Sequence, residues 1–152
     1  MIEVDCNLCC RNDWTVRFPA TTRDITELDV RAFRCTSPEY GSHAQIVQCN
    51  HCDLVYANPR WYPEELAAAY TAVEDETYVD EREGRELTFE KHLQDLEKYT
   101  GPANGRALLD VGAYIGVFVE IARAHGWLAE GIEPSDWAVT TARNRGLPIH
   151  QG

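Results

Sequence analysis

The stretch RALLDVGAYIGVFVEIARAHGWLAEGIEPS, residues Arg106–Ser135, decides the fold of this chain. A short apolar run leads into a turn that carries Gly112 and Gly116, and a helical stretch and a second apolar run ending at Glu133 follow. This order predicts two buried parallel strands joined by a crossover helix. Backbone N–H groups at such a turn can bind a nucleotide-like ligand, and a carboxylate at the end of the second strand can accept hydrogen bonds from ribose hydroxyls.

Two short motifs in this stretch resemble a known family. Residues 109–116, LDVGAYIG, look like the first motif of class I S-adenosylmethionine-dependent methyltransferases, and residues 131–135, GIEPS, look like their acidic second motif. The resemblance implies S-adenosylmethionine as cofactor and an α/β fold with a partial Rossmann-like sheet (the first βαβαβ portion). It places the following residues at the cofactor: Asp110, Gly112, Ala113, Tyr114, Gly116, Glu133, Pro134 and Ser135.

The spacing of the glycines argues against a dinucleotide-binding turn. A G-x-G-x-x-G fingerprint would require glycines at 114 and 117, where this chain has Tyr114 and Val117. Tyr114 also departs from the methyltransferase pattern and narrows the approach to the loop, unless its ring packs along the ligand. A plain βαβ turn that binds nothing is the structural alternative.

The cysteines predict a metal site in the first third of the chain. Two C-x-x-C pairs, Cys6/Cys9 and Cys49/Cys52, supply the four thiolates of a closed, structural zinc site. Free buried thiols are the alternative interpretation. Cys10 and Cys35 stay unassigned, although Cys10 can compete with Cys9 for the first pair.

A second resemblance covers residues 46–60, IVQCNHCDLVYANPR. This segment is similar to the zinc ribbon that precedes the catalytic domain in a subgroup of methyltransferases. Many members of that subgroup methylate carbon atoms of sugars or secondary metabolites, so the similarity implies a small-molecule substrate. It also implies that tyrosines at the positions of Tyr70 and Tyr78 lie over the cofactor. Tyr78 is therefore a candidate cofactor contact, with packing against the domain as the alternative.

The predicted organisation has three segments: a zinc-binding ribbon-like β module at 1–60, a helical linker at 61–104, and the N-terminal part of a Rossmann-like domain at 105–152. Pro63 begins a predicted helix, and Ser135 is the expected N-cap of another. The remaining expectations are strands at 14–18, 46–48, 54–56 and 107–111, an irregular segment at 19–44, a solvated linker or helix start at 74–86, helices at 87–100 and 117–125, and a third parallel strand from 147.

Composition narrows the function classes. The net charge of −11 over 152 residues makes a nucleic-acid or anionic-membrane surface improbable, because neutralising phosphates requires clustered Lys and Arg. No apolar run approaches the length of a membrane span, and the first residues carry no secretory signal. The expected compartment is therefore the cytoplasm.

The predicted strands and helices cover only the first part of a methyltransferase sheet, so we expect the N-terminal portion of a larger enzyme, inactive alone. No catalytic residue can be assigned. An unpaired apolar strand at 107–111 predicts self-association of the fragment through an exposed sheet edge. Two other classes stay open: a non-enzymatic zinc-ribbon interaction module, and a nicotinamide-nucleotide-binding enzyme.

Overall fold

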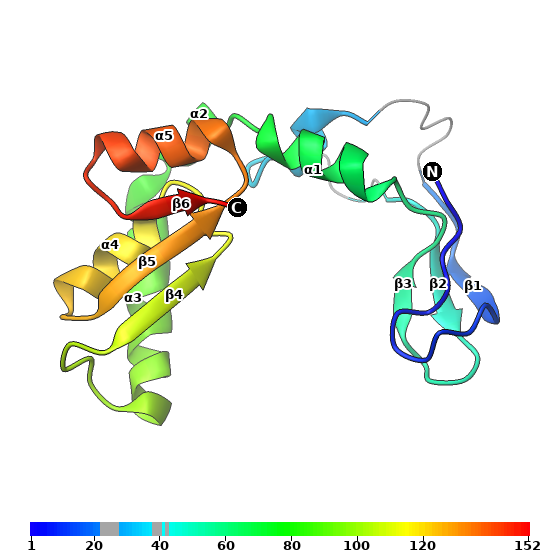
Figure 1. Ribbon diagram of the computed structural model, residues 1–152, viewed down its shortest axis with the longest axis horizontal. Coiled ribbons are helices and arrows are strands. Elements are labelled where there is room, and N and C mark those ends of the chain that lie inside the picture. Colours follow the sequence, from blue (N-terminus) through cyan, green and yellow to red (C-terminus); the bar gives the residue numbers. More distant parts are fainter. Residues whose placement is uncertain (22–27, 38–40, 42) are drawn as a thin grey trace. The chain divides into compact units, whose positions relative to one another are not determined.

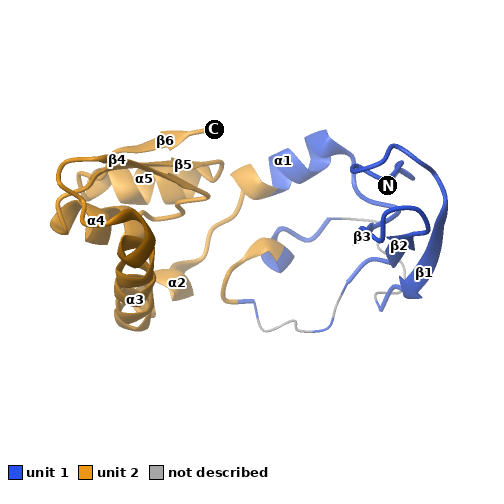
Figure 2. Ribbon diagram, turned by 90° about the horizontal axis from the view of Figure 1, so that it is seen from below, with its two compact units in different colours: residues 1–32, 37–69 blue, residues 33–36, 70–152 orange. Residues whose placement is uncertain are grey.

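The computed structural model describes residues 1–21, 28–37, 41 and 43–152, and these residues divide into two compact units. Unit 1 comprises Met1–Ala32 and Ser37–Ala69, and unit 2 comprises Phe33–Thr36 and Tyr70–Gly152 (Figure 2). Unit 1 contains an antiparallel sheet and unit 2 a parallel sheet with helices, which confirms the predicted α/β class.

Unit 1 is built on three short strands in the order β1-β2-β3 (Figure 1). They are β1 (Trp14–Phe18), β2 (Ile46–Cys49) and β3 (Val55–Ala57). A 3₁₀ turn at Val30–Phe33 lies between β1 and β2 in the sequence, and helix α1 (Pro63–Thr71) follows β3 with proline at its first position.

Unit 2 is a βαβαβ sheet preceded by two helices (Figure 1). The strands run parallel in the order β4-β5-β6, with Asp110 opposite Gly131 and Gly131 opposite Ile149. The elements in chain order are α2 (Glu76–Asp80), α3 (Arg82–Thr100), β4 (Ala107–Val111), α4 (Val117–Ala124), β5 (Leu128–Glu133), α5 (Asp136–Asn144) and β6 (Ile149–Gln151).

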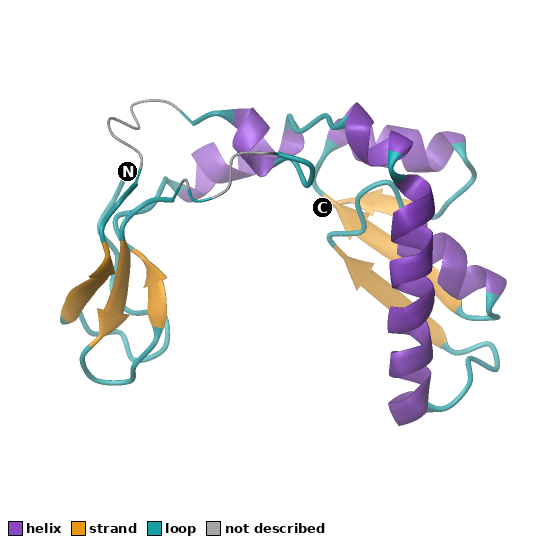
Figure 3. Cartoon of the chain, turned by 180° about the vertical axis from the view of Figure 1, so that it is seen from behind, coloured by secondary structure: helices purple, strands orange, loops and turns teal. Residues whose placement is uncertain are grey.

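Helices α4 and α5 pack on the parallel sheet, and α3 packs against α4 (Figure 3). Successive crossovers that move in the same direction along a parallel sheet place their helices on the same side, because each crossover is right-handed. Helix α4 buries Val117 and Val119 there, and Leu93 of α3 is completely buried. On the uncovered face, Leu109 and Val111 of β4 are exposed.

Most predicted elements are present within a few residues of their expected bounds. Of the two alternatives for the acid-rich segment at 74–86, the structure shows the helix start, since the segment contains α2 and the first turn of α3. Part of the irregular segment predicted at 19–44 lies outside the described residues. None of the described helices has both the length and the hydrophobicity that crossing a membrane requires.

Candidate functional site

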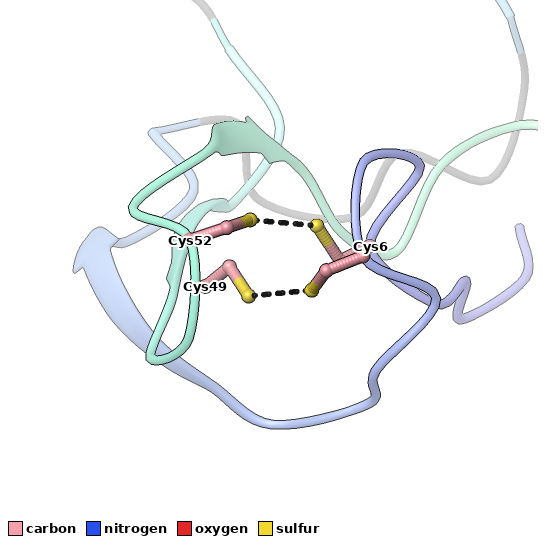
Figure 4. Close-up of side chains that lie close together, drawn as sticks. Cys6, Cys49 and Cys52 are labelled. Carbon is pink, nitrogen blue, oxygen red and sulfur yellow. Dashed lines mark hydrogen bonds between the residues drawn. The ribbon is translucent and has the colours of Figure 1, made fainter.

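Four cysteines of unit 1 converge on one point. The Sγ atoms of Cys6, Cys9, Cys49 and Cys52 all lie within 4.8 Å of one another. The Sγ atoms are 3.4 Å apart for Cys6 and Cys52 and 3.5 Å apart for Cys9 and Cys49 (Figure 4). Four sulfurs at Zn–S distances of about 2.3 Å in a tetrahedron lie about 3.8 Å apart, so the cluster has the size of a zinc site.

Two matching backbone turns position these sulfurs. In each C-x-x-C pair the next residue has a left-handed backbone, with φ of 57° at Cys10 and 62° at Asp53. The N–H of Cys10 donates to the carbonyl of Cys6, and that of Asp53 donates to the carbonyl of Cys49. Each turn therefore folds back on its first cysteine and directs both thiols to the same side.

The pKa values of the four thiols diverge. Burial would raise the pKa of Cys6, but backbone N–H groups of Cys9 and Leu8 outweigh it and lower this pKa to about 7. The N–H of His51 is the largest influence that lowers the pKa of Cys49. Backbone N–H groups would lower the pKa values of Cys9 and Cys52, but burial and the neighbouring thiols outweigh them and raise both pKa values. Four adjacent thiolates repel one another, and a bound divalent metal removes that repulsion. The donor set and its geometry therefore fit zinc, and four thiolates leave no open position for catalysis.

The remaining candidate ligands lie outside the cluster. Cys10 and Cys35 are both exposed, so the first pair uses Cys9 and not Cys10. The Nε2 atom of His51 lies 2.9 Å from a carboxylate oxygen of Asp13, which links the second cysteine turn to the segment before β1. His51 therefore supports the turn from outside.

In unit 2, the loop between β4 and α4 is tightly wound. Gly112, Tyr114 and Gly116 all have positive φ, at 81°, 49° and 76°. Glycine adopts this conformation freely, whereas a tyrosine does so at a cost. A Cβ at Gly131 of β5 would lie 2.4 Å from the Cβ of Ala113, so only glycine at 131 lets the loop pack this closely on the sheet.

Glu133 holds the loop from the end of β5. One carboxylate oxygen accepts a hydrogen bond from the N–H of Tyr114 and the other accepts from the N–H of Ser135, both at 2.9 Å. The side chain is 6% exposed. The predicted juxtaposition of the loop and this acid is therefore present, and the carboxylate retains lone pairs for further donors.

Tyr114 lines two cavities, of about 200 and 230 Å³. Glu133 and Gly112 line the first, whereas Asp110 and Gly112 line the second. The other wall residues are Phe33, Cys35, Tyr70, Val73 and Pro134 in the first cavity, and Tyr78, Phe89, His92, Ala113 and Phe118 in the second.

The carboxylate of Asp110 is half-buried and makes no hydrogen bond or ion pair with any described residue. Burial, and then the negative charge of Glu133, raise the pKa of Asp110. A carboxylate beside the aromatic rings of Tyr78, Phe89 and Phe118 is a favourable environment for a cationic group. The second cavity therefore favours a positively charged ligand moiety.

Ser135 lies beside the site and ties it to its surroundings. Its hydroxyl donates to the carbonyl of Val73 at 2.7 Å and accepts from the N–H of Ala138 at 3.1 Å, as the predicted N-cap of α5. Gly116 precedes α4, and a Cβ there would lie 2.8 Å from Leu147. Ser135 therefore shapes the site through its hydroxyl, and Gly116 through its backbone conformation.

The sequence analysis gave no site role to several residues of the cavity walls: Phe33, Cys35, Val73, Phe89, His92 and Phe118. Phe33 and Cys35 come from the segment at 19–44 that was predicted to be irregular, and Phe89 lies in the helix predicted at 87–100, whose pattern marks no site. No local pattern could have placed these last three residues beside Tyr114, because the chain distance between them and Tyr114 is large. No protein-family model and no curated protein sequence matches this chain.

Proposed function

We propose that this chain binds S-adenosylmethionine in the cavities around Tyr114, as part of a methyltransferase whose zinc site is structural. The observation that carries the proposal is the charge of the loop region. Glu133 already accepts the hydrogen bonds of the Tyr114 and Ser135 amides, and Asp110 adds a second carboxylate nearby. A pyrophosphate would meet two acids there, whereas a sulfonium and an ammonium group are attracted.

The same charge distribution separates this proposal from a nicotinamide cofactor. A dinucleotide is bound by free backbone N–H groups at the start of the helix after the first strand. Here the carboxylate of Glu133 occupies the Tyr114 amide. The ring of Tyr114 fills the position that a dinucleotide-binding turn reserves for glycine.

In the proposed arrangement each group has a distinct part. Glu133 accepts hydrogen bonds from ribose hydroxyls in the first cavity, and Asp110 faces the cationic amino-acid end in the second. The rings of Tyr78 and Phe118 lie along the apolar portion of the ligand. Methyl transfer from a sulfonium requires mainly alignment of donor and acceptor, because the methyl group is already activated. We propose a small molecule, such as a sugar or secondary metabolite, as the acceptor.

Titration calorimetry on the zinc-loaded chain tests the cofactor. We expect S-adenosylhomocysteine to bind, and NAD⁺ and NADP⁺ not to bind. Glu133→Gln should weaken binding of S-adenosylhomocysteine by between about tenfold and a hundredfold, as expected for lost hydrogen bonds to a charged group. Glu130→Gln, an exposed carboxylate of the same strand that pairs with His150, is the matched control and should change nothing.

Asp110→Asn distinguishes a ligand-binding role from a structural one. Because the pKa of Asp110 is raised, the folded state holds its proton more tightly than the unfolded chain, and ionised Asp110 costs stability at neutral pH. The variant should therefore melt at the same or a higher temperature and yet bind S-adenosylhomocysteine more weakly. Binding of a dinucleotide, or of no adenosine ligand at all by the folded, zinc-loaded chain, overturns the proposal; the second result favours an interaction module.

A further inference from the structure

The segment Phe33–Thr36, called the strap below, lies between β1 and β2 in the sequence but belongs to unit 2 by its contacts. The backbone N–H of Thr36 donates to one carboxylate oxygen of Asp75 at 3.1 Å, and its hydroxyl donates to the other at 2.5 Å. Asp75 is 1% exposed and also caps α2. At the other end of the strap, the ring of Phe33 packs edge-on against Tyr70, with 4.8 Å between centroids. The strap is thus fastened to unit 2 at both ends.

The strap forms one wall of the first cavity. Phe33 and Cys35 line it together with Tyr114, Glu133 and Pro134 from the loop and the end of β5. A ligand whose ribose reaches Glu133 therefore lies within the same enclosure as the strap. Burial, and then the charge of Asp75, raise the pKa of Cys35, so this thiol stays protonated at neutral pH.

Tyr114 also lines this cavity, and its hydroxyl is a donor that no described residue uses. Tyr114 is 8% exposed, and its hydroxyl is buried without a hydrogen-bond partner among the described residues. The ring is held between Tyr78 and Trp137, at centroid distances of 4.5 and 6.0 Å. Burial raises the pKa of Tyr114, followed by the charges of Asp75 and Cys35, so the hydroxyl keeps its proton. A buried donor without an acceptor is costly, and a ligand that supplies the acceptor removes that cost.

We infer that the strap and Tyr114 are part of the ligand site: the Tyr114 hydroxyl donates a hydrogen bond to a ribose oxygen of the adenosyl ligand, and Cys35 is covered by that ligand. The inference rests on the proposed function and adds two specificity-determining positions to it. A tyrosine at the strained, glycine-favouring position of the loop then contributes a ligand contact that glycine lacks.

Thiol labelling tests the position of the strap without any activity measurement. The zinc-loaded chain is treated with N-ethylmaleimide with and without saturating S-adenosylhomocysteine, and modification is followed for each cysteine by peptide mass spectrometry. Cys10 is exposed and outside the metal cluster, so it serves as the internal control. We expect bound S-adenosylhomocysteine to slow labelling of Cys35 about tenfold or more, because a covered thiol must wait for ligand release. The rate at Cys10 should not change.

Tyr114→Phe tests the hydroxyl. It keeps the ring contacts and should weaken S-adenosylhomocysteine binding by about three- to tenfold, the usual effect of losing one neutral hydrogen bond. Tyr99→Phe, at a fully solvated tyrosine of α3 that is 91% exposed, is the control. If S-adenosylhomocysteine binds in a Glu133-dependent manner while Cys35 labelling or Tyr114→Phe affinity is unchanged, this inference is wrong and the proposed function stands. Absence of S-adenosylhomocysteine binding overturns both.

Discussion

The two units of the chain have cores of different chemistry. In unit 1, the buried apolar side chains among the described residues are Cys6, Val47, Cys49 and Ala69, so two of the four are candidate metal ligands. In unit 2, the completely buried side chains include Leu93, Ile115, Val117, Val119 and Ile149. Small units that cannot bury enough apolar surface use metals or disulfides instead. Unit 1 should therefore depend on its metal, and unit 2 on packing.

Removing the metal should have the largest effect on stability, and the loss of structure should be confined to unit 1. Structural zinc contributes about 10–16 kcal/mol of apparent binding free energy in small zinc modules, more than a three-stranded sheet of this size can replace. Cys49→Ser should abolish stoichiometric zinc binding and remove hydrogen-exchange protection from β1–β3, while amides of β4–β6 stay protected. Cys10→Ser is the control and should retain zinc. Full protection of β1–β3 in zinc-free Cys49→Ser would contradict the comparison and favour free buried thiols.

A large-to-small substitution in the core of unit 2 should destabilise unit 2 and leave unit 1 unchanged. Leu93 of α3 is completely buried, and Leu93→Ala should lower the free energy of unfolding of unit 2 by about 2–5 kcal/mol with zinc content unchanged. Leu87→Ala on the same helix removes a side chain that is 72% exposed and should cost less than about 0.5 kcal/mol. Urea denaturation followed by near-UV circular dichroism measures both. Equal losses for the two variants would show that α3 is not part of the core.

In both units, the features that the sequence could predict are those encoded by residues close together in the chain. The C-x-x-C spacing is local, so it identifies the four clustered cysteines without knowledge of the fold. The same is true of Ser135, whose side chain accepts from the N–H three residues later, and of strand Ala107–Val111, which lies next to a glycine turn. Asp75, the N-cap of α2, was a local signal that the acid-rich composition of the segment obscured.

The cavity walls follow from contacts that no local pattern encodes. Cys35 lies beside Tyr114 because Thr36 binds Asp75, and Asp75 is positioned in turn by a segment whose Val73 carbonyl accepts from Ser135. Each of these hydrogen bonds joins residues at least 39 positions apart. The sequence likewise could not predict that the Tyr114 hydroxyl has no hydrogen-bond partner among the described residues, because this depends on where the fold positions the ring.

The ion pairs around Glu120 should contribute less to the stability of unit 2 than its apolar core does. The Oε2 atom of Glu120 in α4 lies 2.7 Å from a guanidinium nitrogen of Arg82 in α3. Glu120 also forms an ion pair with Arg145, which follows α5. Burial alone would raise the pKa of Glu120, but the hydrogen bond from Arg82 and the charge of Arg145 lower it. A lowered pKa contributes stability above the unfolded value of about 4.3, and that stability is lost as pH falls through the folded value.

Glu120→Gln should therefore cost at most about 1 kcal/mol at neutral pH, since the group is partly solvated and its interactions are screened. The difference between the variant and the natural chain should shrink as the pH is lowered below about 4. Urea unfolding at a series of pH values measures it. A difference that grows toward acid pH would mean that Glu120 is not paired in the folded state.

The smallest effect on stability is expected at the uncovered face of the sheet, where the variants change assembly. We propose that β4 pairs with β4 of a second copy, because Leu109, Val111 and Leu128 are 57%, 77% and 62% exposed and β4 pairs, within the described chain, only with β5. The free edge of β4 carries one row of unpaired backbone donors and acceptors, and an identical strand can pair with that row about a two-fold axis. Leu109→Lys places a charge in that contact and should convert a concentration-dependent dimer into a monomer by sedimentation velocity, with no change in melting temperature at low concentration. Leu87→Lys, at a leucine of α3 that is 72% exposed, should leave the dimer intact. A natural chain that sediments as a monomer at high concentration would show that apolar exposure on this sheet does not suffice for association.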